Sequence, residues 1–309
     1  MVKKKTILVV GGTGFIGSSL IKYFTKKKFK VVSLSKKKPK KKEAIKEATY
    51  LTGDFCKNFY IKKIEKIKIH YVINAGGYVD HSEDPKKRKY IYGSHYLACQ
   101  RLANVFLKKK IELFLQIGTG NEYGHTRSPN NENSLCRPIS TYAKAKLKAT
   151  KHLLKLNKEY NFPTVIFRIY QLFGPHQNSN RLIPQTIKAC LSNLDFNCTN
   201  GKQIRDFLYI NDFVLSVNNL IKYKNKAIGN IFNIGSSKPH SVKKIIELIN
   251  DNLNSGRPKF GKIKIRKKEV LRNFPNIRKA KKLIYWTPKH TLNQGLKKTI
   301  NYYLDETKK

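Results

Sequence analysis

The sequence predicts an α/β protein with a doubly wound parallel sheet, followed by a smaller C-terminal lobe. An apolar run at residues 6–10 leads directly into a glycine-rich turn, and residues 15–27 then repeat apolar side chains at helical spacing. Short apolar runs and helix-like segments alternate as far as about residue 170, without an internal repeat. This alternation is typical of parallel strands joined by right-handed crossovers, and it stops beyond Pro175.

The order of the expected elements follows from these runs. We expect strands at residues 5–10, 30–35, 48–51, 69–74 and 111–117, and helices at residues 15–27, 85–108 and 141–159. Later helices are expected at residues 182–191, 212–223, 242–252, 276–284 and 292–304, with a polar hairpin at 196–205. Residues 1–170 are predicted to form a dinucleotide-binding domain, to which residues 206–235 return, and residues 171–309 mainly a substrate-binding lobe.

The glycines of the first turn predict a dinucleotide site of the Rossmann type. A strand that turns sharply into a helix directs the first helical N–H groups, and the positive end of the helix dipole, toward a ligand. Gly11 can adopt unusual backbone angles, Gly14 lets a pyrophosphate approach, and Gly17 allows close packing. A purely structural turn is the alternative. The cofactor-binding residues expected here are Gly11, Thr13, Gly14, Phe15, Ile16 and Gly17.

The end of the second strand indicates which nicotinamide cofactor is bound. NAD sites usually place an acidic side chain about twenty residues beyond the glycines, on the ribose 2′-hydroxyl. This chain has Ser35 there, followed by Lys36 and two further lysines. A hydroxyl, adjacent ammonium groups and the lack of a repelling carboxylate favour NADP(H) over NAD(H). The alternative is that these lysines are only surface residues.

Two later strand ends complete the expected cofactor site. Asp54, followed by Phe55, comes after the third strand, where its carboxylate can reach the adenine edge. Ala75 and Gly76 follow the fourth strand and are small enough for the backbone to lie against the cofactor. Because ligands bind at the carboxyl ends of such strands, these residues should lie near the glycine turn.

A candidate catalytic set follows the fifth strand. Thr119 comes at the strand end, and Tyr142 and Lys146 stand one turn apart on one face of a predicted helix. An ammonium beside a phenol stabilises the phenolate, so we expect Lys146 to lower the pKa of Tyr142 from about 10. Tyr142 can then give or take a proton near neutral pH, while Thr119 holds a substrate oxygen.

Further motifs extend over the whole chain in a familiar order. They are Gly11–Gly17, Gly53-Asp54, Thr119 with Tyr123-Gly124, Tyr142 with Lys146, Arg168 with Phe173-Gly174-Pro175, residues 205–212, residues 232–235 and Trp286-Thr287-Pro288. This set resembles the extended short-chain dehydrogenase/reductases, in the NAD(P)-dependent epimerase/dehydratase branch acting on nucleotide sugars. The resemblance implies a catalytic triad of Thr119, Tyr142 and Lys146, with Lys146 also on the nicotinamide ribose. It implies a nucleotide-diphosphate sugar as substrate, with Arg205 at the diphosphate.

The chain also departs from the pattern of this family. Dehydratases of the family carry Asp and then Glu directly after the active-site Thr, whereas here Gly120 and Asn121 follow it and Glu122 comes one position late. His95 stands where an Asn is usual. The resemblance therefore favours carbonyl reduction, as in CDP-linked 4-keto-deoxysugar reductases of the abequose and paratose synthase type, over elimination of water. The substrate-binding residues that it implies are Asn121, Gln171, Arg181, Arg205 and Arg272.

Composition bears on the location of the protein and on metal binding. The 309 residues include no apolar run approaching about 20 residues, and the first strand leaves no room for a signal peptide. The five cysteines are dispersed and the histidines lack metal-ligand spacing, so we expect a cytoplasmic protein with reduced thiols and no metal. A homodimer is left open as its assembly.

The formal net charge of +45 raises the question of nucleic-acid binding. Lysines supply most of this charge, and they are spread over every segment of the chain. Basic tracts such as Lys36–Lys42 lack the interleaved aromatic residues of a groove that binds single strands. We therefore expect a lysine-covered enzyme surface that attracts an anionic substrate, and no nucleic-acid partner. Besides the reductase, two functions stay open for this chain: an epimerase or dehydratase that retains its cofactor, and a catalytically silent dinucleotide-binding sensor.

Overall fold

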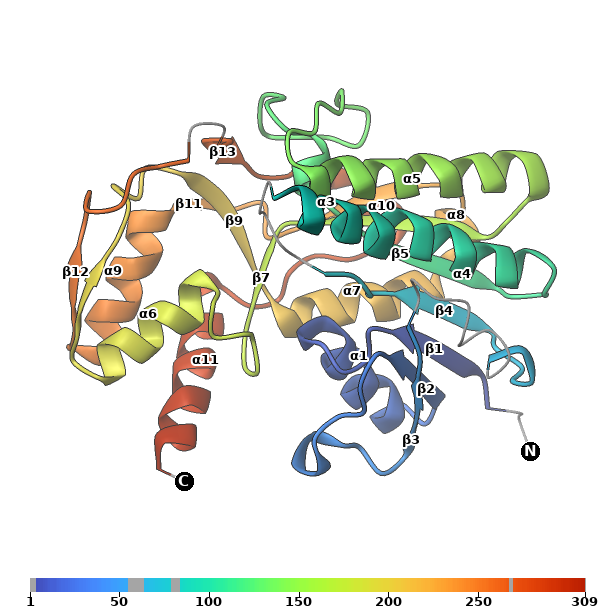
Figure 1. Cartoon of the computed structure of the whole chain (residues 1–309), viewed down its shortest axis with the longest axis horizontal. Helices are drawn as coiled ribbons and strands as arrows, with labels where there is room; N and C mark the ends of the chain where they lie inside the picture. Colours follow the sequence, from blue (N-terminus) through green and yellow to red (C-terminus); the bar gives the residue numbers. More distant parts are fainter. Residues whose placement is uncertain (1–3, 55–63, 79–83, 267–268, 309) are drawn as a thin grey trace.

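A computed structural model describes residues 4–54, 64–78, 84–266 and 269–308. Its centre is a parallel seven-stranded sheet with the strand order β10-β6-β5-β4-β1-β2-β3 (Figure 1). The strands are β1 Thr6–Val10, β2 Lys30–Ser35, β3 Ala48–Thr52, β4 Tyr71–Asn74, β5 Leu113–Thr119, β6 Thr164–Ile169 and β10 Ile231–Ile234. The strand order reverses between β1 and β4, so their carboxyl ends form the switch point at which doubly wound sheets bind ligands. The predicted fold class is confirmed.

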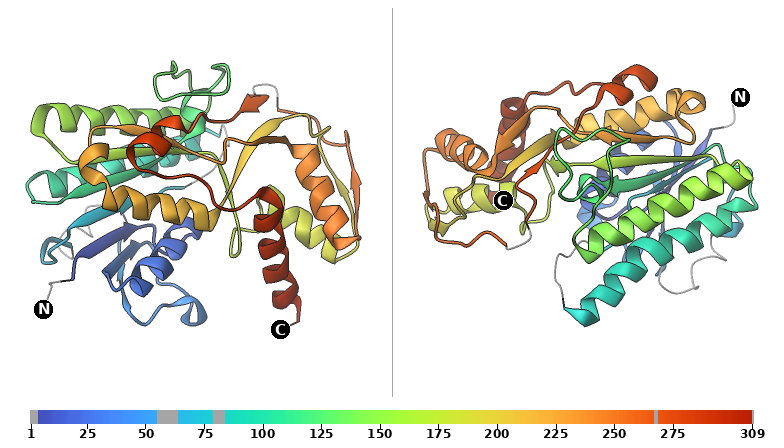
Figure 2. Two further views of the ribbon diagram at one scale, coloured as in Figure 1. Left: turned by 180° about the vertical axis from the view of Figure 1, so that it is seen from behind. Right: turned by 90° about the horizontal axis from the view of Figure 1, so that it is seen from above.

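Helices cover both faces of this sheet (Figures 1 and 2). They are α1 Phe15–Lys26, α3 Pro85–Tyr92, α4 Ala98–Leu107, α5 Thr141–Tyr160 and α7 Ile210–Lys222. Side chains of β1 alternate between the two faces: Ile7 and Val9 join the core under α1 and α7, whereas Leu8 and Val10 join the core under α4 and α5. Burial on both faces explains why the strands are continuous apolar runs.

The smaller lobe is organised around β9, which pairs with β7, β11 and β13. A separate two-stranded sheet joins β8 to β12, and helices α6, α9 and α11 pack against one another beside it (Figure 1). The strands are β7 Gln171–Phe173, β8 Asp195–Asn197, β9 Ile204–Tyr209, β11 Pro239–Ser241, β12 Arg257–Lys259 and β13 Arg272–Asn273. The helices are α6 Leu182–Leu191, α8 Lys224–Ala227, α9 Val242–Leu253, α10 Arg278–Leu283 and α11 Leu292–Thr307, with short 3₁₀ turns at η1 Lys41–Glu43 and η4 Gly120–Glu122. The boundary near residue 170 stays a prediction, and β10 lies beside β6 in the main sheet.

The helical stretch expected at residues 85–108 is confirmed over residues 85–107, with a π-helical turn, η3 Gly93–Leu97, between α3 and α4. One expected element was wrong. The hairpin expected at residues 196–205 does not form, because β8 pairs with the distant β12 and β9 pairs with three other strands. Strand partners this far apart in sequence leave no local signal. Within the described residues, no helix is long and apolar enough to cross a membrane.

The glycine turn yields a stability prediction. A Cβ at Gly17 would lie 2.2 Å from the Gly11 carbonyl oxygen and 2.6 Å from Gly12 Cα, so backbone would have to move. We expect Gly17→Ala to lower the free energy of unfolding by about 1–3 kcal/mol, as overpacked interiors do. Gly93→Ala is the control, because no atom lies within 4 Å of its added Cβ. It should raise stability by about 0.5–1 kcal/mol, since Ala suits a helical backbone better than Gly. Equal denaturation midpoints for the two variants would contradict the predicted contact.

Candidate active site

The glycine turn has the geometry of an anion site. Gly11 has a φ of +75° and donates its N–H to the Leu34 carbonyl oxygen at 2.8 Å, which fixes the turn above β1 and β2. Gly14 is the N-cap residue of α1. A Cβ added there would have one neighbouring atom, the Gly11 carbonyl oxygen, at 3.3 Å. The first turn of α1 holds no acidic residue, and Phe15 and Ile16 at its start pack on the core. The positive end of the helix dipole is therefore open to a phosphate.

The carboxyl end of β4 forms the second wall. The Ala75 N–H donates to the Val10 carbonyl oxygen at 3.1 Å, and a Cβ at Gly76 would lie 2.9 Å from Val10 Cγ1. A side chain at Gly11 would meet the Gly76 backbone at 2.8 Å. The two backbone segments are thus in close contact, and they form one wall of a cradle beside Gly14, where an added Cβ would have a single neighbour. The residues present fit a nicotinamide dinucleotide.

Ser35, Lys36 and Asp54 come together at one end of this cradle. Ser35 is buried, and its Oγ accepts the Thr13 N–H at 3.1 Å, so it also holds the glycine turn. Lys36 Nζ donates to the Tyr90 hydroxyl and lies 3.5 Å from an Asp54 carboxylate oxygen. The expectation that no carboxylate stands near these lysines is therefore wrong. Phe55 lies outside the described residues.

The structure brings Thr119, Tyr142 and Lys146 together in a buried position. Thr119 ends β5, and α5 begins directly before Tyr142, with Ser140 Oγ accepting the Ala143 N–H at 3.2 Å as its cap. The side chains of Thr119 and Tyr142 share a hydrogen bond. Lys146 Nζ donates to the Ile117 carbonyl oxygen at 2.7 Å and lies 6.0 Å from the centroid of the Tyr142 ring.

The proton affinities in this set differ from the expectation in one respect. Burial raises the pKa of Tyr142 to about 12, and the hydrogen bond with Thr119 only partly opposes this. Burial lowers the pKa of Lys146 to about 8, with Glu122 acting in the opposite direction. The expected lowering of the Tyr142 pKa by Lys146 is not observed, because burial of the phenol outweighs the influences that lower its pKa. Tyr142 is therefore protonated at neutral pH, as a proton donor requires.

Glu122 has a structural role that its position in the sequence had not revealed. Its fully buried carboxylate accepts the Thr119 N–H at 3.0 Å and the Arg168 Nε–H at 2.9 Å. It also accepts the Thr150 hydroxyl at 3.0 Å. The pattern Thr-x-x-Glu at residues 119–122 is a capping box, and this signal was readable in the sequence.

The expected substrate residues are placed unevenly. Asn121 accepts an amide N–H from Asn273 at 2.9 Å, beside Arg272 in β13, and β13 pairs with β9 at Ile204 and Arg205. Arg181 is the residue directly before α6. Its positive charge opposes the rise that burial causes in the pKa of Tyr142. Gln171 is exposed in β7. Arg205 and Arg272 thus lie on two neighbouring strands, β9 and β13.

The Arg205 fork already has an acidic partner. Its Nη2 lies 2.8 Å from Glu269 Oε1, and its Nη1 donates to the Ile204 carbonyl oxygen at 2.9 Å. Burial lowers the pKa of Arg205, and Glu269 opposes this. A diphosphate at Arg205 must compete with Glu269, which the sequence did not predict.

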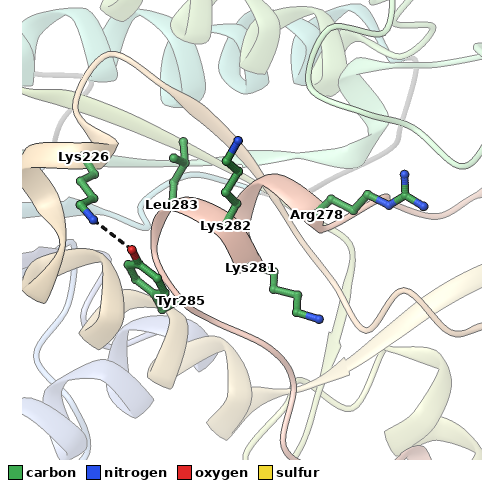
Figure 3. Close-up of a pocket in the computed structure, with 6 residues that line it drawn as sticks. All are labelled: Lys226, Arg278, Lys281, Lys282, Leu283 and Tyr285. Atoms are coloured by element: carbon green, nitrogen blue, oxygen red, sulfur yellow. Dashed lines mark hydrogen bonds between the residues drawn. The ribbon is translucent and has the colours of Figure 1, made fainter.

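Two cavities lie apart from this site. One of about 740 Å³ lies between β9, α9 and the segment before α11. Another of about 650 Å³ is lined by Lys226, Arg278, Lys281, Lys282, Leu283 and Tyr285. In Figure 3, Lys281 and Lys282 point in different directions, and Lys226 donates to the Tyr285 hydroxyl at 3.0 Å. The cationic side chains that line this second cavity therefore do not point toward a common anion site. No group of three or more His, Cys, Asp or Glu residues in the described part of the chain could hold a metal ion.

Comparisons with known proteins place this site in a family. A family model described as the NAD dependent epimerase/dehydratase family matches residues 7–235. An uncharacterised UDP-glucose epimerase of Bacillus subtilis is 28% identical over 315 residues, covering 96% of this chain and 97% of that protein. Human dTDP-D-glucose 4,6-dehydratase is 29% identical, with 97% and 90% covered. CDP-abequose synthase of Salmonella muenchen is 24% identical, with 96% and 97% covered.

Solved structures agree in fold. UDP-glucose 4-epimerase of Thermotoga maritima with UDP-glucose superposes with a TM-score of 0.91 at 21% identity, covering 98% of this chain and 99% of that one. UDP-glucuronic acid 4-epimerase of Bacillus cereus, with UDP-glucuronic acid and NAD, gives 0.90 at 24% identity, covering 97% and 99%. Because the family model spans most of the chain, this protein belongs to the NAD-dependent epimerase/dehydratase family, extended short-chain dehydrogenases that act on nucleotide sugars.

Proposed function

We propose that this protein is a cytoplasmic reductase that converts the carbonyl of a nucleotide-linked 4-keto-6-deoxyhexose into an alcohol. Reduced NADP supplies the hydride when bound. Tyr142 gives the proton to the carbonyl oxygen, and the Thr119 hydroxyl forms a hydrogen bond with that oxygen. The ammonium of Lys146 supplies a positive charge beside Tyr142. The observation that supports this most is the buried set itself, in which a protonated phenol shares a hydrogen bond with Thr119 at the end of β5.

The residues after Thr119 favour reduction over elimination of water. Gly120 has no side chain, and the amide of Asn121 is bonded to Asn273. The carboxylate of Glu122 is buried under the site, with three hydrogen bonds to other groups. These three positions therefore offer no carboxylate as an acid or base for dehydration, although one relative is named a dehydratase.

Epimerisation is the second candidate function. It is favoured by the relative named a UDP-glucose epimerase, which matches this chain over nearly its whole length. An epimerase oxidises and re-reduces one carbon, so it has no net demand for reduced cofactor. Nicotinamide that stays bound through purification supports the epimerase, whereas net NADPH consumption with a 4-keto nucleotide sugar supports the reductase.

The first functional prediction concerns Tyr142. Tyr142→Phe keeps the ring and removes the phenolic proton, so turnover should fall roughly 10²–10⁴-fold with cofactor affinity nearly unchanged. The assay follows NADPH absorbance with a panel of 4-keto nucleotide sugars, and NADPH fluorescence titration measures binding. Tyr160→Phe, at the exposed end of the same helix, is the matched control and should be neutral. Undiminished turnover in Tyr142→Phe would refute the role of Tyr142 as proton donor, whereas a wild-type protein that binds NADPH and turns over none of the panel would support the silent sensor.

The second prediction concerns cofactor choice. If Lys36 receives the 2′-phosphate of NADPH, Lys36→Ala should reduce the preference for NADPH over NADH roughly tenfold. A tenfold change corresponds to the lower end of the free energy that a charge-assisted hydrogen bond contributes, as expected for an exposed lysine. Lys41→Ala, another exposed lysine near the same strand, should leave the ratio of kcat/KM values unchanged. A wild-type protein that uses both cofactors equally would show that Lys36 serves only Asp54 and Tyr90.

The third prediction concerns the substrate diphosphate. Arg205→Ala removes a fork that can bind two phosphate oxygens, so KM for the nucleotide sugar should rise roughly 10–100-fold while KM for the cofactor stays unchanged. Arg257→Ala is the matched control, because its guanidinium pairs with Asp195 on the exposed two-stranded sheet. An unchanged substrate KM in Arg205→Ala would place the diphosphate elsewhere.

A further inference from the structure

The π-helical turn η3 places one side chain directly against the proposed proton donor. His95 lies in this turn and is 2% exposed. Its ring meets the Tyr142 ring edge-to-face, with centroids 4.9 Å apart and planes at 80°. A single π turn shifts the side chains after it around the helix axis, and such turns occur often at functional sites. The interruption between α3 and α4 therefore coincides with the contact to Tyr142.

The hydrogen bonds of His95 define its tautomer. Nε2 lies 2.9 Å from the Tyr78 carbonyl oxygen, which can only accept, so Nε2 carries the proton and Nδ1 the lone pair. Nδ1 is buried and has no hydrogen-bond partner. Burial and the charge of Lys146 lower the pKa of His95 to about 3. The imidazole is therefore neutral at physiological pH and adds no charge to the surroundings of Lys146.

Gly77 closes the other side of the imidazole. Its φ is +139°, and a Cβ there would lie 2.1 Å from His95 Cε1 and 2.3 Å from Nδ1. The imidazole thus occupies the space that a side chain at position 77 would fill. It is held between the Gly77 backbone, the Tyr78 carbonyl and the Tyr142 ring, so it has little freedom to move.

We propose that His95 is a positioning residue, which fixes the Tyr142 ring in the orientation needed for proton transfer. This inference rests on the proposed function, in which Tyr142 is the proton donor. Edge-to-face contact between aromatic rings is a preferred geometry, and it constrains the tilt of the phenol. His95 acts through Tyr142, so its loss should reduce kcat rather than substrate binding. A misplacement of about 1 Å at a reacting group can cost about a hundredfold in rate.

Two variants separate the contributions of the ring and of the N–H group. His95→Phe keeps an aromatic ring and loses the donor to Tyr78, whereas His95→Asn keeps a donor and loses the ring. His95→Asn should lower kcat roughly 10–100-fold, and His95→Phe by a smaller factor, because it keeps a ring against Tyr142 but loses the hydrogen bond that holds that ring in place. KM and NADPH affinity should stay within about twofold of wild type in both. In His95→Asn the basic limb of the kcat/KM profile should move to lower pH. Burial is what raises the pKa of Tyr142, and the smaller side chain admits water.

His152→Asn is the matched control. His152 also has an unpartnered buried ring nitrogen, and it packs edge-to-face on Tyr96 with centroids 6.3 Å apart. The same chemical change there should leave kcat and the pH profile unchanged. Gly77→Ala tests the same contact by another route, because its added methyl group would push the imidazole of His95 without changing that side chain. It should also lower kcat. Gly77→Ala carries the test if His95→Asn does not fold, as judged by circular dichroism.

The outcomes distinguish this inference from the proposed function. Wild-type kcat and pH profiles in both His95 variants, with Tyr142→Phe inactive, would overturn the inference and leave the function intact. A loss confined to KM, or an equal fall of kcat in His152→Asn, would also overturn it, since His95 would then act in binding or only in packing. Full activity of Tyr142→Phe would overturn both.

Discussion

The elements of the site depend on one buried ion pair, between Glu122 and Arg168. The carboxylate of Glu122 joins the end of β5 through the Thr119 N–H, α5 through the Thr150 hydroxyl, and β6 through Arg168. Removing one partner of a fully buried pair leaves an uncompensated charge and typically costs about 3–5 kcal/mol. The pair therefore holds Thr119 in register with the helix that carries Tyr142 and Lys146. Arg168 in turn stacks on the Tyr123 ring at 4.5 Å, which extends this support to the loop after β5.

Burial sets the chemistry that this support makes available. The interior disfavours both a phenolate and an ammonium, and accordingly the pKa of Tyr142 rises while that of Lys146 falls. A neutral phenol beside a lysine that ionises near pH 8 is suited to donating a proton and recovering it. The neutral imidazole of His95 preserves this balance, because an imidazolium there would further destabilise the charge on Lys146.

The sequence predicted the parts of the site that local patterns encode. Glycine spacing located the turn before α1, and helical spacing put Tyr142 and Lys146 on one face of α5. The capping box at Thr119–Glu122 is equally local, although its glutamate also resembles the family's acidic residue displaced by one position. No local pattern indicated the π turn at His95, and the helix it contacts, α5, begins more than 40 residues later in the chain. The ion pair of Arg205 with Glu269 joins residues that are 64 positions apart in the sequence, and no local pattern reports such a contact.

The distribution of acidic residues explains why the lysine surface says little about function. The chain has 19 acidic residues against 64 basic ones, and several of the acids lie in the interior. Asp206 accepts the backbone N–H and hydroxyl of Ser236, and Asp212 accepts the N–H of His290 while bonding its ring. Glu122 and Glu132 likewise accept backbone N–H groups. Lysine has no acceptor and cannot replace an acid at these positions, whereas exposed positions tolerate either charge. The buried acids that accept backbone N–H and hydroxyl groups therefore cannot be exchanged for lysine, whereas the surface can carry it at most positions. The net charge thus describes the exposed surface, while the proposed chemistry depends on the buried groups.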